Sequence, residues 1–410
     1  MTTANTAGPI RIGFLYNHEE LHQVAHTAPI ISRLQGLAPQ IDVEVLTSSD
    51  SQTEAVISHL DPQVTLPPIR RMNAGRLVKA AEKATGGIVP LRRIGGLAAN
   101  RDLLGSYDAL VVPETTTTLL KTRFGMQRPR LIFCPHGAGD RSISVSPDIA
   151  HFDYVLLPGD KTRERMMAGG VIRAEDHAVV GYPKFDAPHL AARTKFFDND
   201  RPTVLYNPHF DPLLSSWHDF GLQVLEYFAA QDTYNLIFAP HVMLFQRRVL
   251  ASVEHRKLRF RQEIPARYRG LPHIRIDTGS ERSVDMSYTR NADLYLGDVS
   301  SQVYEFIQHP RPAIFINSHD AKWRDDPSYA FWHFGQAISD VNQLPAALHQ
   351  AFPLGEEYRQ RQAAAFEQTF SIDPAKPSAS RAADAIAAYL AREWPARFAL
   401  GTTPSMKSKA

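Results

Sequence analysis

The sequence is poor in the features that would connect it with secretion, membranes or nucleic acids. Cys134 is its only cysteine, so the chain cannot form an internal disulfide, which is compatible with a reducing compartment. No apolar run approaches the roughly 18 residues that a membrane-spanning helix requires. The start of the chain lacks the charged segment and apolar core of a secretory signal. A net charge of +2 gives no general reason to expect nucleic-acid binding. We therefore expect a cytoplasmic protein that binds no nucleic acid.

Several motifs of common enzyme sites are also missing. The first β-α-β segment lacks G-x-G-x-x-G, which disfavours a nicotinamide-type dinucleotide site. The chain has no G-x-x-x-x-G-K-[ST] phosphate loop and no G-x-S-x-G nucleophile elbow, so P-loop and hydrolase-triad chemistry lose support. It also has no H-E-x-x-H and no Cys/His spacing of a zinc site. We predict neither a bound metal nor a cofactor.

What the sequence does contain is an alternation of short apolar runs and helical segments, over a length that suggests two or three domains. The apolar runs predict buried strands at residues 10–16, 41–46, 108–113, 130–134, 154–157, 177–180, 203–206, 235–239, 273–276, 294–296 and 313–316. Crossovers through helices make such strands parallel. We predict an α/β protein of two Rossmann-like domains, residues 1–195 and 200–378, whose parallel sheets face a central cleft.

The connecting segments complete this prediction. Helical spacing predicts helices over residues 19–37, where Pro29 either kinks the helix or marks its true start, and over residues 242–255. A last helix within residues 379–398 has one apolar face, and we expect it to pack back on the N-terminal domain. Residues 399–410 are too polar to fold, so we expect a disordered tail.

The stretch of residues 291–316 carries the first candidate site. The predicted strand 294–296 is followed by Gly297-Asp298-Val299, then by Ser300 and Ser301, which are candidate N-caps of a short helix. Such a turn offers backbone N–H groups, the positive end of a helix dipole and two hydroxyl donors, which suit a phosphate or diphosphate. The alternative is a plain N-cap without a ligand.

Histidines follow four of the predicted strands, and three of them stand in the same Pro-His context: His18, His136, His209 and His241. A single histidine of this kind is usually a capping or core residue, but strand ends of parallel sheets face ligands. We select His136 as a general base, because imidazole titrates near neutrality and flanking glycines let a substrate approach. Asp140 either orients this imidazole or the acceptor, or is only a turn former.

The other two Pro-His histidines lie in the second half of the chain with the serine pair. His209 and His241 could donate hydrogen bonds to a diphosphate and stabilise a leaving group. Glu305, one turn into the helix after Ser301, could accept hydrogen bonds from ribose hydroxyls. The alternative for Glu305 is an exposed helical glutamate. We therefore group His209, His241, Ser300, Ser301 and Glu305 as donor-binding and phosphate-binding candidates.

Residues 70–101 form a basic stretch, with eight lysines and arginines against the single acid Glu82 and with apolar residues between them. One interpretation is a solvated helical face. The other is a surface for anionic lipid or for a phosphate-rich acceptor, which would place the protein on the inner face of the cell membrane.

Several of these motifs, taken in order, resemble the CDP-glycerol glycerophosphotransferases, the teichoic acid polymerase-like family. The resemblance covers about residues 130–345, and departs from the family pattern at Val299 and in the loops after His136 and Asn207. The segments that carry it are His136-Gly137, Gly181-Tyr182-Pro183-Lys184-Phe185-Asp186, Pro208, His241, Asp298-Val299-Ser300-Ser301, Arg311-Pro312-Ala313-Ile314-Phe315 and Trp323-Arg324-Asp325-Asp326.

The resemblance implies a GT-B fold, a nucleotide-diphosphate donor held by the second half and a hydroxyl acceptor, lipid-linked in some cases, held by the first. It also implies His136 as base, His241 with Ser300 and Ser301 as phosphate contacts, and no bound metal. The expected activity is transfer of a polyol phosphate from a CDP-activated donor in cell-surface polymer synthesis. Two alternatives stay open: a GT-B glycosyltransferase or 2-epimerase that uses a UDP-sugar, and a non-catalytic nucleotide-sugar-binding protein.

Overall fold

A computed structural model describes residues 8–18, 20–73, 91–138, 146–187, 190, 193–252, 255–353 and 355–399. The chain divides into two compact units. The N-terminal unit comprises Met1–His136, Val145–Ala187 and Phe370–Ala410, and the C-terminal unit comprises Gly137–Ser144 and Pro188–Thr369. None of the helices in the described residues is long and apolar enough to cross a membrane.

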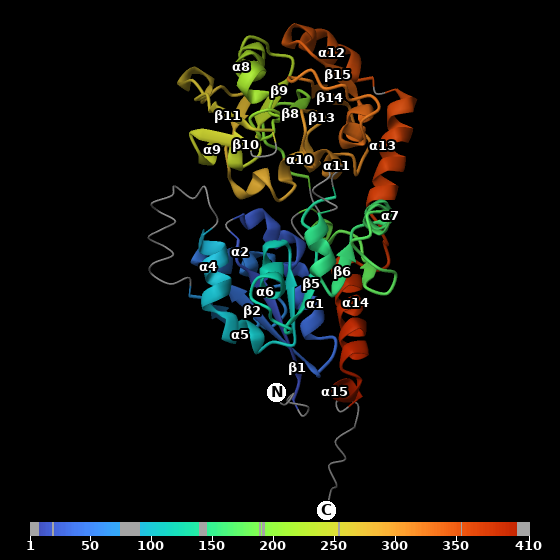
Figure 1. The fold of residues 1–410 in the computed structure, drawn as a ribbon. Helices are drawn as coiled ribbons and strands as arrows, with labels where there is room; N and C mark the ends of the chain where they lie inside the picture. Colours follow the sequence, from blue (N-terminus) through green and yellow to red (C-terminus); the bar gives the residue numbers. More distant parts are fainter. Residues whose placement is uncertain are drawn as a thin grey trace, which may run out of the picture. The chain divides into compact units, whose positions relative to one another are not determined.

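The N-terminal unit is built on a parallel sheet, in which Figure 1 labels β1, β2, β5 and β6. Its seven strands within the described residues have the order β3-β2-β1-β4-β5-β6-β7. Several strands are apolar throughout and buried along their whole length, as expected for a parallel sheet covered on both faces. The strands are β1 Ile10–Tyr16, β2 Ile41–Thr47, β3 Ile69–Arg71, β4 Ala109–Val112, β5 Arg130–Phe133, β6 Tyr154–Leu157 and β7 His177–Val179.

The C-terminal unit has a second parallel sheet, of six strands in the described residues, in the order β12-β9-β8-β13-β14-β15. Its strands are β8 Thr203–Asn207, β9 Asn235–Phe238, β12 Ile274–Ile276, β13 Leu294–Gly297, β14 Ala313–Ile316 and β15 Gln336–Ile338. In chain order both sheets follow the Rossmann sequence 3-2-1-4-5-6, in which ligands bind at the carboxyl ends of the strands beside the point where the order reverses. The prediction of two parallel α/β domains is confirmed.

The described part of the N-terminal unit also contains helices. They are α1 Ala28–Gln35, α2 Asp50–His59, α4 Leu91–Ala99, α5 Arg101–Gly105, α6 Leu119–Thr122, α7 Asp160–Ala168, α14 Ser378–Glu393 and α15 Pro395–Ala399. The single helix predicted over residues 19–37 is instead a 3-10 turn at Leu21–His26 followed by α1. Pro29 stands in the first turn of α1, where its missing N–H costs no hydrogen bond, so it marks the true start of that helix.

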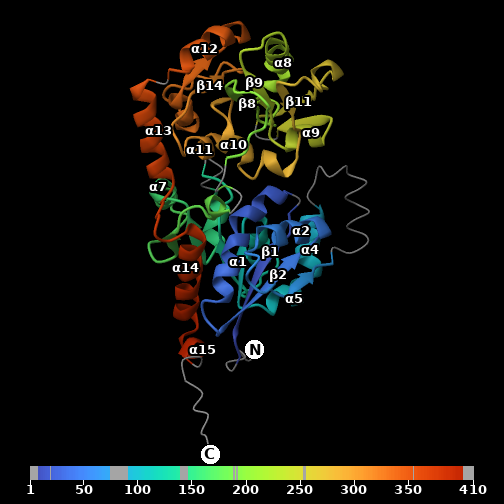
Figure 2. The ribbon, with the colours of Figure 1, turned by 180° about the vertical axis from the view of Figure 1, so that it is seen from behind.

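The last long helix, α14, belongs to the N-terminal unit, where it runs beside α1 (Figure 2). Its apolar residues Ala382, Ile386 and Leu390 are buried in the same core cluster as Ile30 and Leu34 of α1. Tyr389 stacks on Tyr154 of β6, with ring centroids 4.6 Å apart. Residues far apart in the sequence thus share one core.

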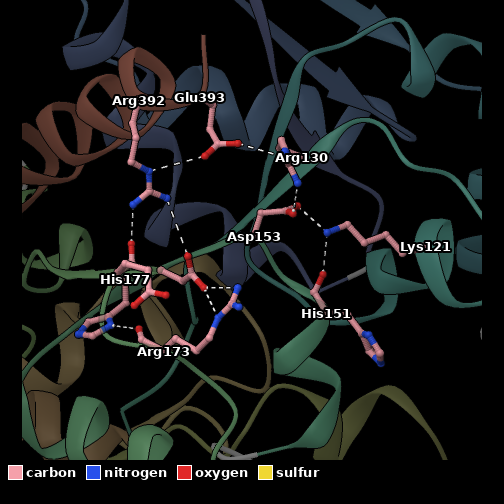
Figure 3. A network of polar contacts seen from close by, with 10 residues as sticks. Lys121, Arg130, His151, Asp153, Arg173, His177, Arg392 and Glu393 are labelled. Carbon is pink, nitrogen blue, oxygen red and sulfur yellow. Dashed lines mark hydrogen bonds and ion pairs between the residues drawn. The ribbon is translucent and has the colours of Figure 1, made fainter. Parts of the chain in front are cut away.

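Ion pairs fix the carboxyl end of α14 on the sheet (Figure 3). Arg130 at the start of β5 bridges Asp153 at 2.9 Å and Glu393 at 3.0 Å. Beside Glu393, Arg392 donates to the Glu175 carbonyl at 2.7 Å. The side chains of Arg130 and Arg392 are 45% and 46% exposed, so water screens these ion pairs. We therefore expect the pairs to orient the helix end rather than to add much stability.

Helices also cover the sheet of the C-terminal unit: α8 Leu222–Ala229, α9 Met243–Gln246, α10 Ser287–Asn291, α11 Gln302–Phe306, α12 Leu344–Ala351 and α13 Glu356–Thr369. The helix predicted over residues 242–255 is wrong. Only α9 is helical there, and the chain continues as the antiparallel ribbon β10 Val249–Ser252 and β11 Lys257–Phe260. Val249–Ser252 and Lys257–Phe260 pair as antiparallel strands, with side chains that alternate between the two faces of the ribbon. This pairing excludes the helix that the spacing of apolar residues suggested.

Candidate functional site

In the N-terminal unit, His136 follows β5 at the carboxyl edge of the sheet. Its Nδ1 lies 2.6 Å from the carbonyl oxygen of Pro113, which follows the neighbouring strand β4. A carbonyl only accepts hydrogen bonds, so Nδ1 carries the proton and donates it. Nε2 is then the ring nitrogen with the lone pair, and the Gln23 side-chain amide lies 3.4 Å from it. The ring is held in the tautomer that can accept a proton at Nε2.

The electrostatic surroundings keep His136 neutral. Desolvation by the surrounding protein lowers its pKa below the ordinary 6.5, although the residue keeps an exposed edge. The hydrogen bond to Pro113 and the charges of Glu20 and Glu114 act in the opposite direction and are outweighed. A neutral imidazole with an accepting Nε2 has the form that a general base needs at neutral pH.

Three more histidines lie near His136, and two of them were not selected from the sequence. The rings of His22 and His26 lie 6.1 and 6.3 Å from that of His136. Burial lowers the pKa of His18 to about 3, and burial followed by the charge of Lys184 lowers that of His26 well below 6.5, so both are neutral. Among the described residues, no group of His, Cys, Asp or Glu side chains could hold a metal ion. The i, i+4 spacing of His22 and His26 was the signal available in the sequence.

Asp140, predicted to orient His136 or the acceptor, lies outside the described residues. Within the described part of the chain, the Pro113 carbonyl performs the orienting role for the ring. Gln23, which approaches Nε2, was also missed, because no sequence pattern connects a 3-10 turn at residue 23 with a strand end at residue 136.

In the C-terminal unit, β9, β8 and β13 are adjacent, so the residues that follow them share one edge of the sheet. The rings of His209 and His241 lie 5.6 Å apart, and Phe210 contacts both. The backbone N–H of Asp211 donates to Nδ1 of His209 at 3.0 Å, and that of Met243 donates to Nδ1 of His241 at 3.3 Å. An accepting Nδ1 leaves the proton of a neutral ring on Nε2. The structure therefore brings the two predicted histidines together as two Nε2–H donors.

Asp298 organises the loops around these histidines. It is fully buried and accepts hydrogen bonds from the backbone N–H groups of His209 at 2.8 Å, Ser216 at 2.7 Å and Val299 at 2.6 Å, and from the Ser216 hydroxyl at 2.8 Å. Burial raises the pKa of its carboxyl to about 6, against the effect of these donors. In the sequence Asp298 stood out only as part of a motif, and its carboxylate proves to fix the loop that carries His209.

The predicted serines directly precede α11, and Glu305 is the fourth of its five residues. Ser300 is buried, and its Oγ accepts a hydrogen bond from the Gln302 N–H at 3.3 Å, whereas Ser301 is exposed and makes no side-chain cap bond. Ser301 thus occupies the N-cap position without a side-chain cap bond, and Ser300, one residue earlier, supplies the hydroxyl that accepts from the first turn. Glu305 is only 6% exposed, so the alternative of an exposed helical glutamate is wrong. With five residues, α11 contributes less dipole than a long helix would.

The G-Y-P-K-F-D segment has a structural explanation inside the N-terminal unit. Gly181 has a φ of +86°, and a Cβ at this position would lie 2.6 Å from the Ser371 carbonyl oxygen. Asp186 accepts a hydrogen bond from the Ala379 N–H in the first turn of α14 at 2.6 Å. Its glycine and its aspartate therefore attach the returning end of the chain to the N-terminal unit.

The basic stretch at residues 70–101 is described only in part, because residues 74–90 and the side chain of Arg92 lie outside the described residues. Three of its arginines form ion pairs, at 2.6–2.9 Å: Arg70 with Glu44, Arg71 with Asp50 and Arg93 with Glu20. These carboxylates offset part of its charge. Its contact with a membrane stays a prediction.

We compared the chain with protein-family models, with curated protein sequences and with solved structures. The chain matches no protein-family model and no curated protein sequence. Among solved structures, it is similar to wall teichoic acid polymerase TagF soaked with CDPG, at 14% identity and a TM-score of 0.57, over 95% of this chain and 90% of that one.

Two further solved structures are similar to a comparable degree. The UDP-GlcNAc 2-epimerase of Neisseria meningitidis, bound to UDP-GlcNAc, has 12% identity and a TM-score of 0.55, over 94% of this chain and 100% of that one. S. aureus MnaA with UDP has 10% identity and a TM-score of 0.57, over 94% and 97%. Likenesses of this level in sequence show the architecture alone. From them and from the two parallel sheets, the chain has a GT-B-like fold.

Proposed function

We propose that this protein is a transferase that moves a polyol phosphate, such as glycerol phosphate, from a CDP-activated donor to a hydroxyl acceptor in cell-surface polymer synthesis. The observation that carries the proposal is the set of backbone groups that bond to Nδ1 of its histidines, from which we infer the position of each ring proton. His136 offers a lone pair on Nε2, and His209 and His241 offer N–H groups on Nε2. One set suits removal of a proton, and the other suits an anionic leaving group.

The proposed reaction uses both sets. His136 Nε2 takes the proton of the acceptor hydroxyl, and the resulting oxygen attacks the phosphorus atom that carries the polyol. A new P–O bond forms, the bond to the bridging oxygen breaks, and CMP leaves. His209 and His241, with Ser300 and Ser301, donate hydrogen bonds to the phosphate that gains charge, and Glu305 accepts from the ribose. No metal is required in this scheme, because these donors supply the charge stabilisation.

A second candidate is glycosyl transfer or 2-epimerisation with a UDP-sugar. It is favoured by the similarity of the fold to the epimerase bound to UDP-GlcNAc and to MnaA with UDP, as TagF with CDPG favours the first candidate. In glycosyl transfer the same base would activate an attack at the anomeric carbon instead of phosphorus. A third, non-catalytic candidate would bind the nucleotide without turnover.

The deciding experiment is a thermal-shift panel of CDP, CDP-glycerol, UDP and UDP-GlcNAc, without added metal. A ligand at a hundredfold excess over its dissociation constant stabilises the folded protein by about 2.7 kcal/mol. A selective shift with CDP-glycerol supports polyol-phosphate transfer, and a selective shift with UDP-GlcNAc replaces it with the sugar-nucleotide function. No shift with any nucleotide contradicts the proposal.

The His136→Ala variant separates an enzyme from a binding protein. We expect turnover with the preferred donor to disappear while the nucleotide-induced thermal shift stays as in the wild type. His177→Ala is a matched control, because His177 lies at the opposite end of a strand of the same sheet, where its ring bonds to the nearby Arg173 carbonyl. Unchanged turnover in His136→Ala would remove the base from the mechanism.

A further inference from the structure

The ribbon β10–β11 has one face made entirely of apolar residues. The register pairs Val249 with Phe260 and Ala251 with Leu258. Residues directly opposite each other in an antiparallel pair lie on the same face, and successive residues alternate between faces. These four side chains therefore form one surface, which we call the apolar ribbon face.

The apolar ribbon face points away from its own unit. Leu258 is 62% exposed, Phe260 is 74% exposed and Val249 is 43% exposed, so they are among the most exposed large apolar residues in the described part of the chain. On the opposite face, Leu250 and Ser252 are buried, and Leu250 belongs to the core cluster of the C-terminal unit. Figures 1 and 2 show β11 beside α9, on the side of this unit away from β14.

Contacts around the ribbon hold this orientation. Arg259, on the inner face, pairs with Asp219 at 2.6 Å. Just after β11, Arg261 donates to the Phe245 carbonyl at 3.1 Å and its guanidinium lies over the Phe245 ring. A ribbon held in this way cannot turn its apolar ribbon face inward without breaking these contacts and withdrawing Leu250 from the core.

The charge around the face indicates its partner. Residues 247–261 contain six arginines and lysines against the single acid Glu254. Four of the basic residues are exposed: Arg247, Arg248, Arg256 and Lys257. A second copy of the chain would set these cations against the same cations, which disfavours self-association. Nucleic acids would find one aromatic ring to stack on, because the other members of the face are aliphatic.

We propose that the apolar ribbon face docks on an anionic lipid surface, with Leu258 and Phe260 entering the acyl boundary and the flanking cations contacting the headgroups. This surface is separate from residues 70–101. The ribbon begins three residues after α9, which itself follows His241, so docking would hold the donor-binding loop at the membrane. Only that last consequence rests on the proposed function, and vesicle binding can be measured without nucleotide.

The test is co-sedimentation of the full-length protein with phosphatidylcholine vesicles, with and without phosphatidylglycerol. We expect binding only to the anionic vesicles. The double variant Leu258→Asn/Phe260→Asn should bind at least about tenfold more weakly, since each side chain contributes apolar area to the acyl boundary. Both positions are exposed, so folding should be unaffected. The control is Ile372→Asn, a change at a site that is 48% exposed in the N-terminal unit.

A second arm tests the charges. The double variant Arg248→Gln/Arg256→Gln should also weaken partition by at least about tenfold, because each cation near an anionic surface contributes to binding. The control is Lys322→Gln/Arg359→Gln, at two positions on other elements of the same unit. Wild-type binding in either test variant overturns the proposal, as does failure of the wild type to bind anionic vesicles.

The single buried cysteine permits a direct measurement of insertion. Phe260→Cys can be labelled with an environment-sensitive fluorophore while Cys134 stays protected in the core, and Ile372→Cys is the labelled control. A blue shift on anionic vesicles only at position 260 supports docking, and an equal response at both positions overturns it. Binding of poly(U), or a dimer in solution, that is lost in Leu258→Asn/Phe260→Asn would assign the face to RNA or to a second copy instead.

Discussion

The histidines of the two units all lie at carboxyl ends of parallel strands, but they follow different strands of the sheet order and carry their protons on opposite nitrogens. His136, His209 and His241 each follow a proline at the carboxyl end of a parallel strand. In the N-terminal unit the carbonyl of Pro113, on the neighbouring strand connection, fixes the proton on Nδ1. In the C-terminal unit backbone N–H groups two residues further along the chain fix it on Nε2.

The difference shows that the same Pro-His pattern can yield a proton acceptor or a proton donor at Nε2, depending on which backbone group bonds to Nδ1. A carbonyl makes the far side of the ring an acceptor, and an N–H group makes it a donor. In the C-terminal unit the partner is local, because the chain turns back immediately after each histidine. In the N-terminal unit the partner is distant in sequence, so only the paired strands β4 and β5 supply it.

The largest expected effect on activity comes from a comparison of glutamine at position 136, the proposed base, with glutamine at position 241, the proposed donor. Glutamine can donate a hydrogen bond from about the position of Nε2 but cannot accept a proton. His136→Gln should therefore lower kcat by about 10²–10⁴-fold, the usual contribution of a general base. His241→Gln should retain most of the activity. Steady-state kinetics with the donor from the nucleotide panel measure both variants.

The pH profile adds an independent check on His136. A base acts only when it is neutral, and desolvation by the surrounding protein holds the pKa of His136 below 6.5. In the wild type, kcat/KM should be constant above about pH 6.5 and fall in more acidic solution. The residual activity of His136→Gln should lack this acid limb. An acid limb of the same position in the variant would mean that another group titrates.

The second effect concerns affinity. A hydrogen bond to a charged group contributes about 1.5–3 kcal/mol, so His209→Ala and His241→Ala should each weaken nucleotide-diphosphate binding by roughly 10–100-fold. At position 241, glutamine should restore part of the affinity and asparagine should not, because only glutamine reaches the place of Nε2. Isothermal titration gives the dissociation constants. Equal affinities for the glutamine and asparagine variants would argue against donation from Nε2.

Much of the fold could be predicted from the sequence, because buried parallel strands are apolar throughout and stand out as short runs. Strands such as β1 and β14 coincide with predicted runs in this way. The edge strands β3 and β15 are three residues long and carry polar residues, so they gave no such signal. The ribbon β10–β11 was hidden because Val249 and Leu250, on opposite faces of β10, stand four and five residues after Phe245, which imitates the spacing of a helix.

Less of the candidate site could be predicted. Strand ends identify His136, His209 and His241 as neighbours of a sheet edge, since topology alone fixes that placement. The tautomers depend on backbone atoms whose positions no side-chain pattern reports. Asp298 is the clearest example, because its four donors come from three separate positions along the chain, which only the folded loops bring together.

Asp298 offers the third test, which asks whether His209 must be held by its loop in order to bind the nucleotide. An asparagine in its place sets an amide N–H₂ against backbone donors, so Asp298→Asn should lower the free energy of unfolding by about 1–3 kcal/mol and weaken nucleotide binding through His209. The control Asp219→Asn removes a carboxylate of the same unit from a half-exposed pair with Arg259. Urea unfolding with titration of the nucleotide measures both quantities.

The pH dependence of this effect has a definite sign. The pKa of Asp298 is about 6 in the folded protein, against 3.8 as the ordinary value. A raised pKa contributes stability that is fully present below pH 3.8 and is lost as the pH rises through about 6. The amide introduced by Asp298→Asn does not titrate, so the stability gap between the wild type and this variant should narrow over this interval. A constant gap would show that the carboxyl has an ordinary pKa, and a gap that widens would show that its pKa is lowered; either result contradicts the raised value.

The smallest effect separates the two serines of the phosphate-binding prediction. Ser300→Ala removes the acceptor of the Gln302 N–H and should cost about 0.5–1.5 kcal/mol of stability. Ser301→Ala removes an exposed hydroxyl without a cap bond and should leave stability unchanged. If Ser301 donates to the donor's phosphate, its alanine variant loses affinity by a few-fold at constant stability, since a neutral hydroxyl contributes about 1 kcal/mol. Loss of neither stability nor affinity in Ser301→Ala would remove Ser301 from the donor site, while the histidine pair would still stand as the contact for the anionic phosphate.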